Sequence, residues 1–406
     1  MACTSMGPGS AKRCQAPAVS SEARSRLRLL IPAAVVGAYL AIVFAIGAPG
    51  GWRDLGVPGK SLSFFDLRSV TTGWVCTRRG IDVLPRNPCD PELRPANYPR
   101  IWLWPSHLGL GVGATVPLGI AIAVVFLATA ILLAPRDGHW WRTVAYSVFL
   151  VTPGVMLGVE RGNVDLLLFC LAALAVWLFA RPARRWASAG VVLVASILKL
   201  FPIFELPLLL RQPRRQAVVA IAAVAVGFGA YVLATLDDIR TIVHAVPKSG
   251  RYSYGLDILG HPLSRHVPGD RYVWDAVLAI VAFVAAILIA RRMRSTEAPR
   301  FELDAFVAGV SVFGLTYVFF RNFDYRLAFL LLTLPLLLRR AGERRIEAWA
   351  TLAAMLGALC LESRRALPEG VVSQYALFVL LLAQLFVVRR ITSRPSNIHG
   401  SSPSGR

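Results

Sequence analysis

The sequence predicts an all-α polytopic membrane protein with about 12 transmembrane segments and a long first extracytoplasmic loop. Of its 406 residues, 56% are hydrophobic and only 17% are charged, whereas soluble domains carry about 25% charged residues. The mean hydropathy is +0.57. Twelve spans of roughly 20 residues would use about 240 positions, close to the whole apolar content of the chain. This composition excludes a soluble, a fibrous or a disordered protein.

The charge balance is strongly basic, with 44 Lys and Arg against 23 Asp and Glu. In a soluble protein this excess would indicate nucleic-acid binding. Here the basic residues cluster in short loops between apolar runs, where they set topology and contact anionic headgroups. We therefore expect membrane lipids as partners and no nucleic acid. The six cysteines are scattered and form no CxxC pair, so no metal centre is expected.

The N-terminal segment 1–28 is a basic tail that we expect in the cytoplasm. The first apolar run, 29–48, has about 20 residues, which is too long for a signal-peptide core of roughly 7–15. We interpret it as an uncleaved signal anchor. The alternative is a cleaved signal that ends near Ala48.

A polar first extracytoplasmic loop, 49–110, follows this anchor. The Ser-, Pro- and Gly-rich tail 391–406 is expected to be disordered and cytoplasmic. Residues 29–390 thus form a single polytopic membrane domain in this interpretation. After the anchor, its apolar runs are 112–134, 142–159, 164–181, 186–199, 201–210, 216–235, 273–290, 303–320, 327–338, 346–361 and 371–388.

The stretch 186–210 decides the topology of the second half. It could form one tilted helix or a helical hairpin around Lys199 and Pro202. A single helix would place the later basic clusters outside the cell, against the positive-inside tendency. The hairpin keeps both termini in the cytoplasm, but its short limbs require burial within the protein. The Arg- and Ala-rich composition points to a bacterial plasma membrane. We favour the hairpin, and the single helix stays open as the alternative for 186–210.

In the hairpin topology, unusual polar residues gather at one membrane face, in four segments: 63–103, 157–169, 199 and 320–331. Ionisable residues inside membrane segments are costly and therefore tend to be functional.

Three of these segments carry a family resemblance. ERGNVDLLLF (160–169), LKLFPIFELPLLL (198–210) and NFDYRLAFLL (322–331) resemble the membrane glycosyltransferases of family 87, which are multispanning enzymes of the GT-C class. FFDLRSVTTGWVCTRRGIDVL (64–84) looks like the Asp, small-residue helix and Gly-x-Asp pattern of that family. The resemblance covers most of residues 29–340.

This resemblance implies a GT-C-like fold and a hexosyltransferase. The sugar, mannose in the best-known members, would pass from a polyprenyl-phosphate donor to a glycolipid or cell-envelope glycan acceptor on the extracytoplasmic face. No cofactor beyond the lipid-linked donor is implied. Members carry an essential acidic residue in the first external loop, and Asp66 occupies the matching position.

The chemistry also directs attention to this face. A carboxylate must accept the acceptor proton, a role worth about 10²–10⁴ in rate, and cationic or amide groups must hold the phosphate. Asp66 is the expected catalytic base, with Asp82 and Asp90 as secondary candidates that could equally be turn residues. Asp66 could itself merely cap a short helix. No DxD pair occurs in the external segments, so no metal is expected.

Donor and phosphate binding is assigned to polar residues of the other three segments. Lys199, between two leucines, is expected to meet phosphate or Glu160, and Arg326 is expected to bind phosphate with Asp324 as its orienting partner. Solvated or purely structural ion pairs are the alternative for each. The complete set is Glu160, Arg161, Asn163, Lys199, Arg321, Asp324 and Arg326. Asp165 is expected to pair with an Arg or Lys inside the bundle.

Cys76 and Cys89 are expected to form a disulfide, because both lie 13 positions apart in a loop placed in the oxidising compartment. Two other functions fit a twelve-segment chain: a secondary transporter, and a lipid-linked polysaccharide polymerase or flippase. A transporter should concentrate polar residues near the bilayer midplane, whereas here they lie at one end of the spans.

Overall fold

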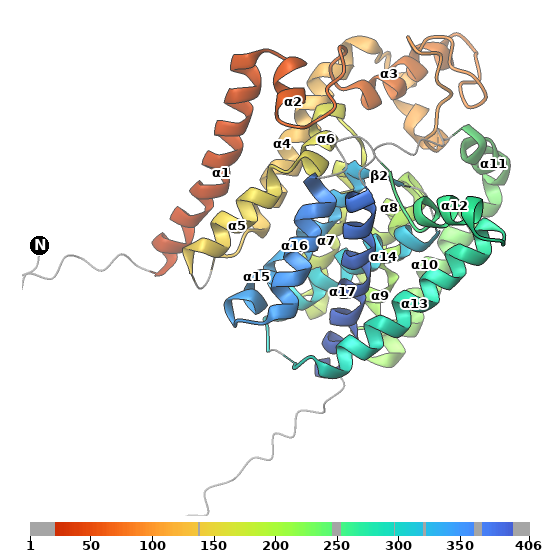
Figure 1. Ribbon diagram of the computed structural model, residues 1–406. Helices are drawn as coiled ribbons and strands as arrows, with labels where there is room; N and C mark the ends of the chain where they lie inside the picture. The colour runs from red at the N-terminus through yellow and green to blue at the C-terminus, as the bar shows by residue number, and fades with distance from the viewer. Residues whose placement is uncertain are drawn as a thin grey trace, which may run out of the picture.

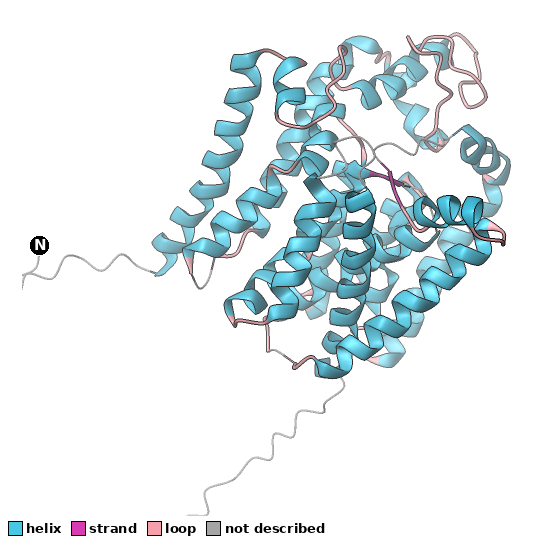
Figure 2. Ribbon diagram, in the orientation of Figure 1, coloured by secondary structure: helices cyan, strands magenta, loops and turns pink. Residues whose placement is uncertain are grey.

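The computed structural model describes residues 21–136, 139–245, 253–295, 297–319, 322–360 and 368–392. These residues form a helical bundle with a folded loop region across one end (Figure 1). Figure 2 shows how completely helices dominate. The strands in the described residues are β1 (Ser253–Tyr254) and β2 (Asn322–Phe323), which pair antiparallel. The chain is thus an all-α membrane protein.

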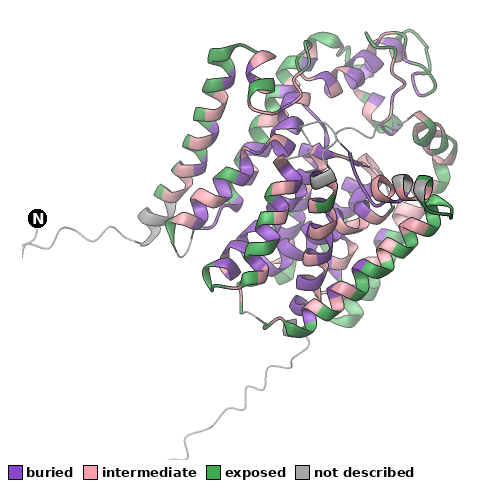
Figure 3. Cartoon of the chain, viewed as in Figure 1, coloured by how far each residue is buried: buried purple, intermediate pink, exposed green. Residues whose placement is uncertain are grey.

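Six helices of the described chain are long and apolar enough to cross a membrane. Each has about 20 residues or more, and at 1.5 Å per residue this covers the roughly 30 Å hydrocarbon core. Helix α14 lies at the centre, and 83% of the residues in its apolar 18-residue stretch are buried. In α1, α10 and α13 the corresponding share is 17%, and these helices form the periphery (Figure 3). The six are α1 (Ser21–Ile46), α4 (Thr115–Leu133), α10 (Arg214–Ala234), α13 (Arg271–Arg292), α14 (Arg300–Phe319) and α17 (Pro368–Thr392).

The remaining bundle elements are shorter. Helices α5 (Trp140–Leu150) and α6 (Pro153–Arg161) meet at a bend of 52°, where Pro153 begins the second helix because it cannot supply a backbone N–H to the first. The others are α7 (Asp165–Phe179), η3 (Pro182–Arg184), α8 (Arg185–Leu198), η4 (Phe201–Glu205), α9 (Leu206–Leu209), η5 (Asp324–Leu332), α15 (Leu334–Gly342) and α16 (Ile346–Cys360).

The segment 186–210 is broken at Lys199, where α8 ends and η4 begins. Both outer ends of this segment approach the same part of the bundle. Arg211, after α9, pairs with Asp304 at 2.5 Å. Arg185, at the start of α8, lies 5.7 Å from the Phe179 ring, and Arg300, which pairs with Asp304 at 3.6 Å, lies 5.9 Å from the same ring. This is the geometry of a hairpin rather than of one continuous helix.

Other basic residues lie at this same end, which we call the basic end. Arg28 of α1 donates a hydrogen bond of 2.8 Å to the carbonyl of Arg136. Arg339 contacts Glu302 at 2.6 Å, and Arg340 donates to Gln384 of α17 at 3.1 Å. The beginning of α1 and the end of α17 are thus at one end of the bundle. The basic end comprises Arg28, Arg136, Arg181, Arg184, Arg185, Arg211, Arg300, Arg339 and Arg340.

The opposite end, the loop end, is covered by residues 49–110 with a small hydrophobic core of their own. Leu67, Val70 and Trp74 form one side of this core, and the disulfide Cys76–Cys89 closes it. Helices α11 and α12 lie at the same end of the bundle (Figure 1). The elements of this end are α2 (Gly50–Asp54), α3 (Phe65–Arg78), η1 (Arg100–Leu108), η2 (Val112–Ala114), α11 (Leu236–Ala245) and α12 (Asp257–His266).

Candidate active site

The start of helix α3 is fixed by an unusual residue, Phe64. Its backbone is left-handed, with φ of 52°, a conformation that costs a non-glycine residue roughly 1–2 kcal/mol. Its side chain fits against two glycines: an added Cβ would lie 2.9 Å from Phe64 at Gly162 and would overlap the Phe64 ring at Gly119. Gly162 itself has φ of 58° and ends helix α6. These contacts hold the N-terminus of α3 against the end of α6.

Asp66 lies in the first turn of α3, where the helix dipole favours a negative charge. Its carboxylate accepts a hydrogen bond of 2.7 Å from the side-chain amide of Asn163. The Asn163 carbonyl oxygen in turn accepts from the backbone N–H of Asp165 at 2.9 Å, and Asn163 is fully buried. These two hydrogen bonds of the Asn163 side-chain amide fix the direction in which it presents its donor to Asp66.

Asp165, the first residue of α7, links two cations from distant parts of the chain. Its carboxylate lies 2.5 Å from Lys199 and 3.0 Å from Arg326. Lys199 also lies 4.8 Å from the Tyr98 ring, and Arg326 lies 4.0 Å from the Phe201 ring. With two partly buried cations around one buried anion, this triad keeps one net positive charge. Lys199 was expected to meet phosphate or Glu160; the carboxylate that it contacts is Asp165.

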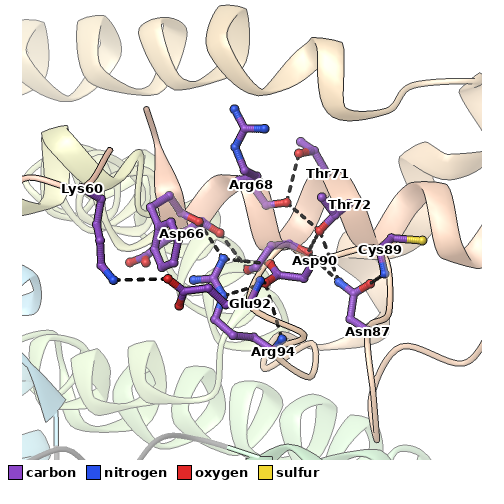
Figure 4. A network of polar contacts seen from close by, with 12 residues as sticks. Lys60, Asp66, Arg68, Thr71, Thr72, Asn87, Cys89, Asp90, Glu92 and Arg94 are labelled. Carbon is purple, nitrogen blue, oxygen red and sulfur yellow. Dashed lines mark hydrogen bonds and ion pairs between the residues drawn. The ribbon is translucent and has the colours of Figure 1, made fainter. Parts of the chain in front are cut away.

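Three further cations surround Phe65, the residue before Asp66. Arg94 lies 3.7 Å from the ring centre, Lys60 4.6 Å and Arg161 5.5 Å. Buried Asp90 holds Arg94 at 2.8 and 3.0 Å, and Arg94 also donates to the Phe65 carbonyl at 3.1 Å (Figure 4). Asp90 therefore orients Arg94.

Glu160 contacts the other two cationic residues, Arg161 and Lys60. It is 5% exposed, pairs with Arg161 at 2.8 Å and accepts a hydrogen bond of 2.8 Å from the backbone N–H of Lys60. Arg161 also donates to the Pro58 carbonyl at 3.0 Å. Glu160 thus ties the beginning of the loop to helix α6.

Asp66 and these cations line a common cavity of about 290 Å³ at the loop end. Lys60, Arg94 and Arg161 supply positive charge, and Glu92, which pairs with Lys60 at 3.4 Å, supplies a second carboxylate (Figure 4). Aromatic side chains complete the wall: Phe65, Tyr98, Phe323 and Tyr325. Burial and the nearby carboxylates Asp66 and Asp165 raise the pKa of Tyr98 well above its usual range, so its hydroxyl stays protonated. A carboxylate, cations and rings in one cavity suit a sugar joined to a phosphate.

Comparison with known families gives a match over residues 101–319 to the model of glycosyltransferase family 87. This range is more than half of the 406 residues. The chain belongs to glycosyltransferase family 87. It is therefore a membrane glycosyltransferase. No curated protein and no solved structure matches it. The matched range includes Glu160, Asn163 and Lys199, and it begins after the part of the loop that contains Asp66.

Asp82 lies away from the cavity of this glycosyltransferase. It accepts a hydrogen bond from the backbone N–H of Leu84 at 3.2 Å and pairs with Arg100 at 3.0 Å. Arg100 also pairs with Asp238 of α11 at 2.8 Å. The Arg100 guanidinium is the main cause of the lowered pKa of Asp82. Asp82 therefore connects the loop to α11.

Three predicted site residues lie near β2, and the structure describes two of them, Asp324 and Arg326. Asp324 is buried, and Arg326 donates to the Asn322 side chain as well as to Asp165. Arg321 lies outside the described residues. Within the described part of the chain, no group of three or more His, Cys, Asp or Glu side chains could hold a metal ion.

Sequence reasoning missed Lys60, Arg94 and Tyr325 as parts of the site. Lys60 carried a usable signal, because the chain has only four lysines and Lys199 is another. Arg94 lies in a loop with several arginines, and nothing in the sequence distinguishes it from Arg86 or Arg100. Its role depends on the loop core and the disulfide, which bring 89–97 against the start of α3.

Proposed function

We propose that this glycosyltransferase transfers a hexose, with mannose the expected sugar, from a polyprenyl-phosphate donor to a glycolipid or cell-envelope glycan. The observation that carries the proposal is the position of Asp66 on the wall of a cavity that also contains Lys60, Arg94 and Arg161. The carboxylate provides a proton acceptor, and the cations provide compensation for phosphate charge.

In the proposed reaction, an acceptor hydroxyl oxygen attacks the anomeric carbon of the donor sugar. The hydroxyl proton passes to Asp66 as the new glycosidic bond forms. The bond between the anomeric carbon and the phosphate oxygen breaks, and polyprenyl phosphate leaves with the electron pair. Arg161 and its neighbours Lys60 and Arg94 would stabilise the charge that develops on this phosphate.

The remaining predicted residues would act around these groups. Asn163 would position Asp66, and Glu160 would hold Arg161 toward the cavity. Lys199 and Arg326, with Asp165 between them, would supply positive potential behind Tyr98 and Tyr325. Asp324 and Arg321 remain proposed members of the donor-binding set. No cofactor other than the lipid-linked donor enters this scheme.

We also propose twelve membrane crossings in one domain, 29–390, with both termini on the cytoplasmic side of a bacterial plasma membrane. Besides the six long helices, the crossings would be α5 with α6, α7, α8, η4 with α9, η5 with α15, and α16. The common position of Arg185 and Arg211 relative to Asp304 supports this count. The Arg-rich basic end would then face the cytoplasm, as the positive-inside tendency favours.

The test is incubation of membranes that contain the protein with polyprenyl-phosphate mannose labelled in the sugar. We expect label in a larger glycolipid or glycan, and at least about 10²-fold less of this transfer with Asp66→Asn. Label that crosses sealed vesicles still attached to the original polyprenyl phosphate would indicate a flippase. Equal transfer with and without the protein would contradict the proposal.

A further inference from the structure

A second cavity lies at the basic end, far along the bundle from Asp66. Its volume is about 650 Å³, within the roughly 300–1,000 Å³ of small-molecule sites. It is formed by α4, α7, α14 and the start of α15. Its wall is mainly apolar and includes Leu132, Leu133, Leu174, Trp177, Phe301 and Pro335. Such a wall suits hydrocarbon chains.

This second cavity is open to the surface, and we call it the groove. Its mouth carries arginines without carboxylate partners in the described part of the chain. Arg136 lines the groove and donates to the Leu132 carbonyl at 3.0 Å, and Arg28 donates to the Arg136 carbonyl at 2.8 Å. Arg181 lies 3.5 Å from the Trp177 ring centre and Arg184 5.5 Å from it. A guanidinium has five N–H donors, so a single backbone bond leaves most of them available.

One carboxylate, Glu302, also lines the groove, but its charge is already matched. Arg339 contacts both oxygens of Glu302, each at 2.6 Å. This two-point pair neutralises the acid and directs it away from a ligand role. The mouth therefore has a net positive charge above an apolar wall.

We propose that this groove binds an anionic phospholipid from the leaflet at the basic end. The acyl chains would lie against α4 and α7, and the phosphate would contact Arg136 and Arg181. Basic pockets between membrane helices at the cytoplasmic surface are a recurrent arrangement for anionic headgroups. The site is separate from the cavity at Asp66 and does not depend on the proposed reaction.

Native mass spectrometry of the purified full-length protein with added phosphatidylglycerol or phosphatidylcholine of equal chain length tests the headgroup. We expect one phosphatidylglycerol to bind about tenfold more tightly than phosphatidylcholine, and Arg136→Gln with Arg181→Gln to abolish the preference. The matched control is Arg291→Gln with Arg292→Gln, an equal charge change in exposed residues at the end of α13. Equal loss in both double variants would mean general attraction to the basic end and would overturn the site.

Cys170 provides a test of the acyl-chain position, because it lines the groove. Phosphatidylglycerol should slow maleimide modification of Cys170 several-fold. Cys360 of α16, which does not line the groove, should react at an unchanged rate in the same sample. Unchanged modification of Cys170, or retention of an isoprenoid phosphate instead of phospholipid, would contradict the proposal. Both thiols can be followed by peptide mapping.

Discussion

Asn163 donates a hydrogen bond of 2.7 Å to Asp66 across 97 positions of sequence. An amide donor fixes the direction of a carboxylate without placing the full positive charge of an arginine or lysine on it. Asp66 is thus held in place by a neutral donor, as its proposed role as a base requires. The cations of the cavity lie around neighbouring Phe65.

The first prediction concerns the base. Asp66→Asn keeps the size of the side chain but removes the proton acceptor, so transfer should fall by about 10²-fold or more. Expression should be unchanged. Asp82→Asn is the matched control, because Asp82 pairs with Arg100 away from the cavity, and it should retain most of the transfer. Near-normal transfer by Asp66→Asn would refute the assignment.

Asn163 should act through Asp66. Asn163→Asp would place a second carboxylate beside the first, which should raise the pKa of the pair. We expect the acidic limb of the pH–rate profile to move to higher pH by about one unit or more. Asn163→Ala should lower transfer about tenfold with a much smaller movement of that limb. Identical pH profiles for the two variants would leave Asn163 with a merely structural role.

Gly162 should matter because of its contact with Phe64. Gly162→Ala would both strain a backbone with φ of 58° and displace Phe64. Gly80→Ala is the control: Gly80 has φ of 76°, but an added Cβ meets nothing within 4 Å. Both variants should lose about 1 kcal/mol of stability from backbone strain. Gly162→Ala alone should reduce transfer strongly, as measured in protein of equal purity and folding.

The topology can be tested at exposed positions on the two sides of the bundle. In a background without Cys3, Cys14, Cys170 and Cys360, Gln216→Cys should resist a membrane-impermeant maleimide in intact cells. Arg271→Cys, at the loop end, should react. Both residues are exposed, so burial does not explain a difference between them. The reverse pattern would contradict the proposed orientation.

The link from Asp82 to Arg100 should make the loop sensitive to acid. Because the pKa of Asp82 is lowered by Arg100, the pair stabilises the folded loop above the ordinary Asp pKa of about 3.9. That stabilisation should be lost as the pH falls through the lowered value. Hydrogen exchange of residues 82–100 should thus be steady at neutral pH, after correction for intrinsic rates, and increase under strong acid. With Asp82→Asn, this acid dependence should be absent.

The sequence predicted the helical membrane fold. It also predicted that one end of the bundle holds Asp66, Glu160, Asn163, Lys199 and Arg326. These inferences depend on hydropathy and charge placement, which are local properties. The sequence predicted that Asp165 pairs with an Arg or Lys inside the bundle, which the structure confirms. It did not identify Lys199 as that cation, because Glu160 and Asp165 lie at similar depth near one helix boundary. The packing of η5 against α7 places Arg326 at Asp165, and the packing of α8 and η4 against α7 places Lys199 there.

The fit of Phe64 against Gly119 and Gly162 was equally unpredictable. Gly162 lies in the ERGN segment (160–163), but the close approach of a ring from a separate loop has no local signal in the sequence. The disulfide pairing, in contrast, required only two cysteines and an oxidising side of the membrane, and the structure joins those cysteines.

The break at Lys199 has a consequence for biosynthesis. The second limb of the hairpin, which we call the return limb, consists of η4 with five residues and α9 with four. At the rise per residue of 3₁₀- and α-helices it is only about 16 Å long. It also carries Glu205, whose buried carboxylate has no hydrogen-bond partner among the residues that the structure describes. As a membrane crossing, which is the role proposed for it, a segment of this length would not span the roughly 30 Å hydrocarbon core by itself. In that topology the translocation machinery would release α8 and its return limb together, and the pair would need later helices to enclose it.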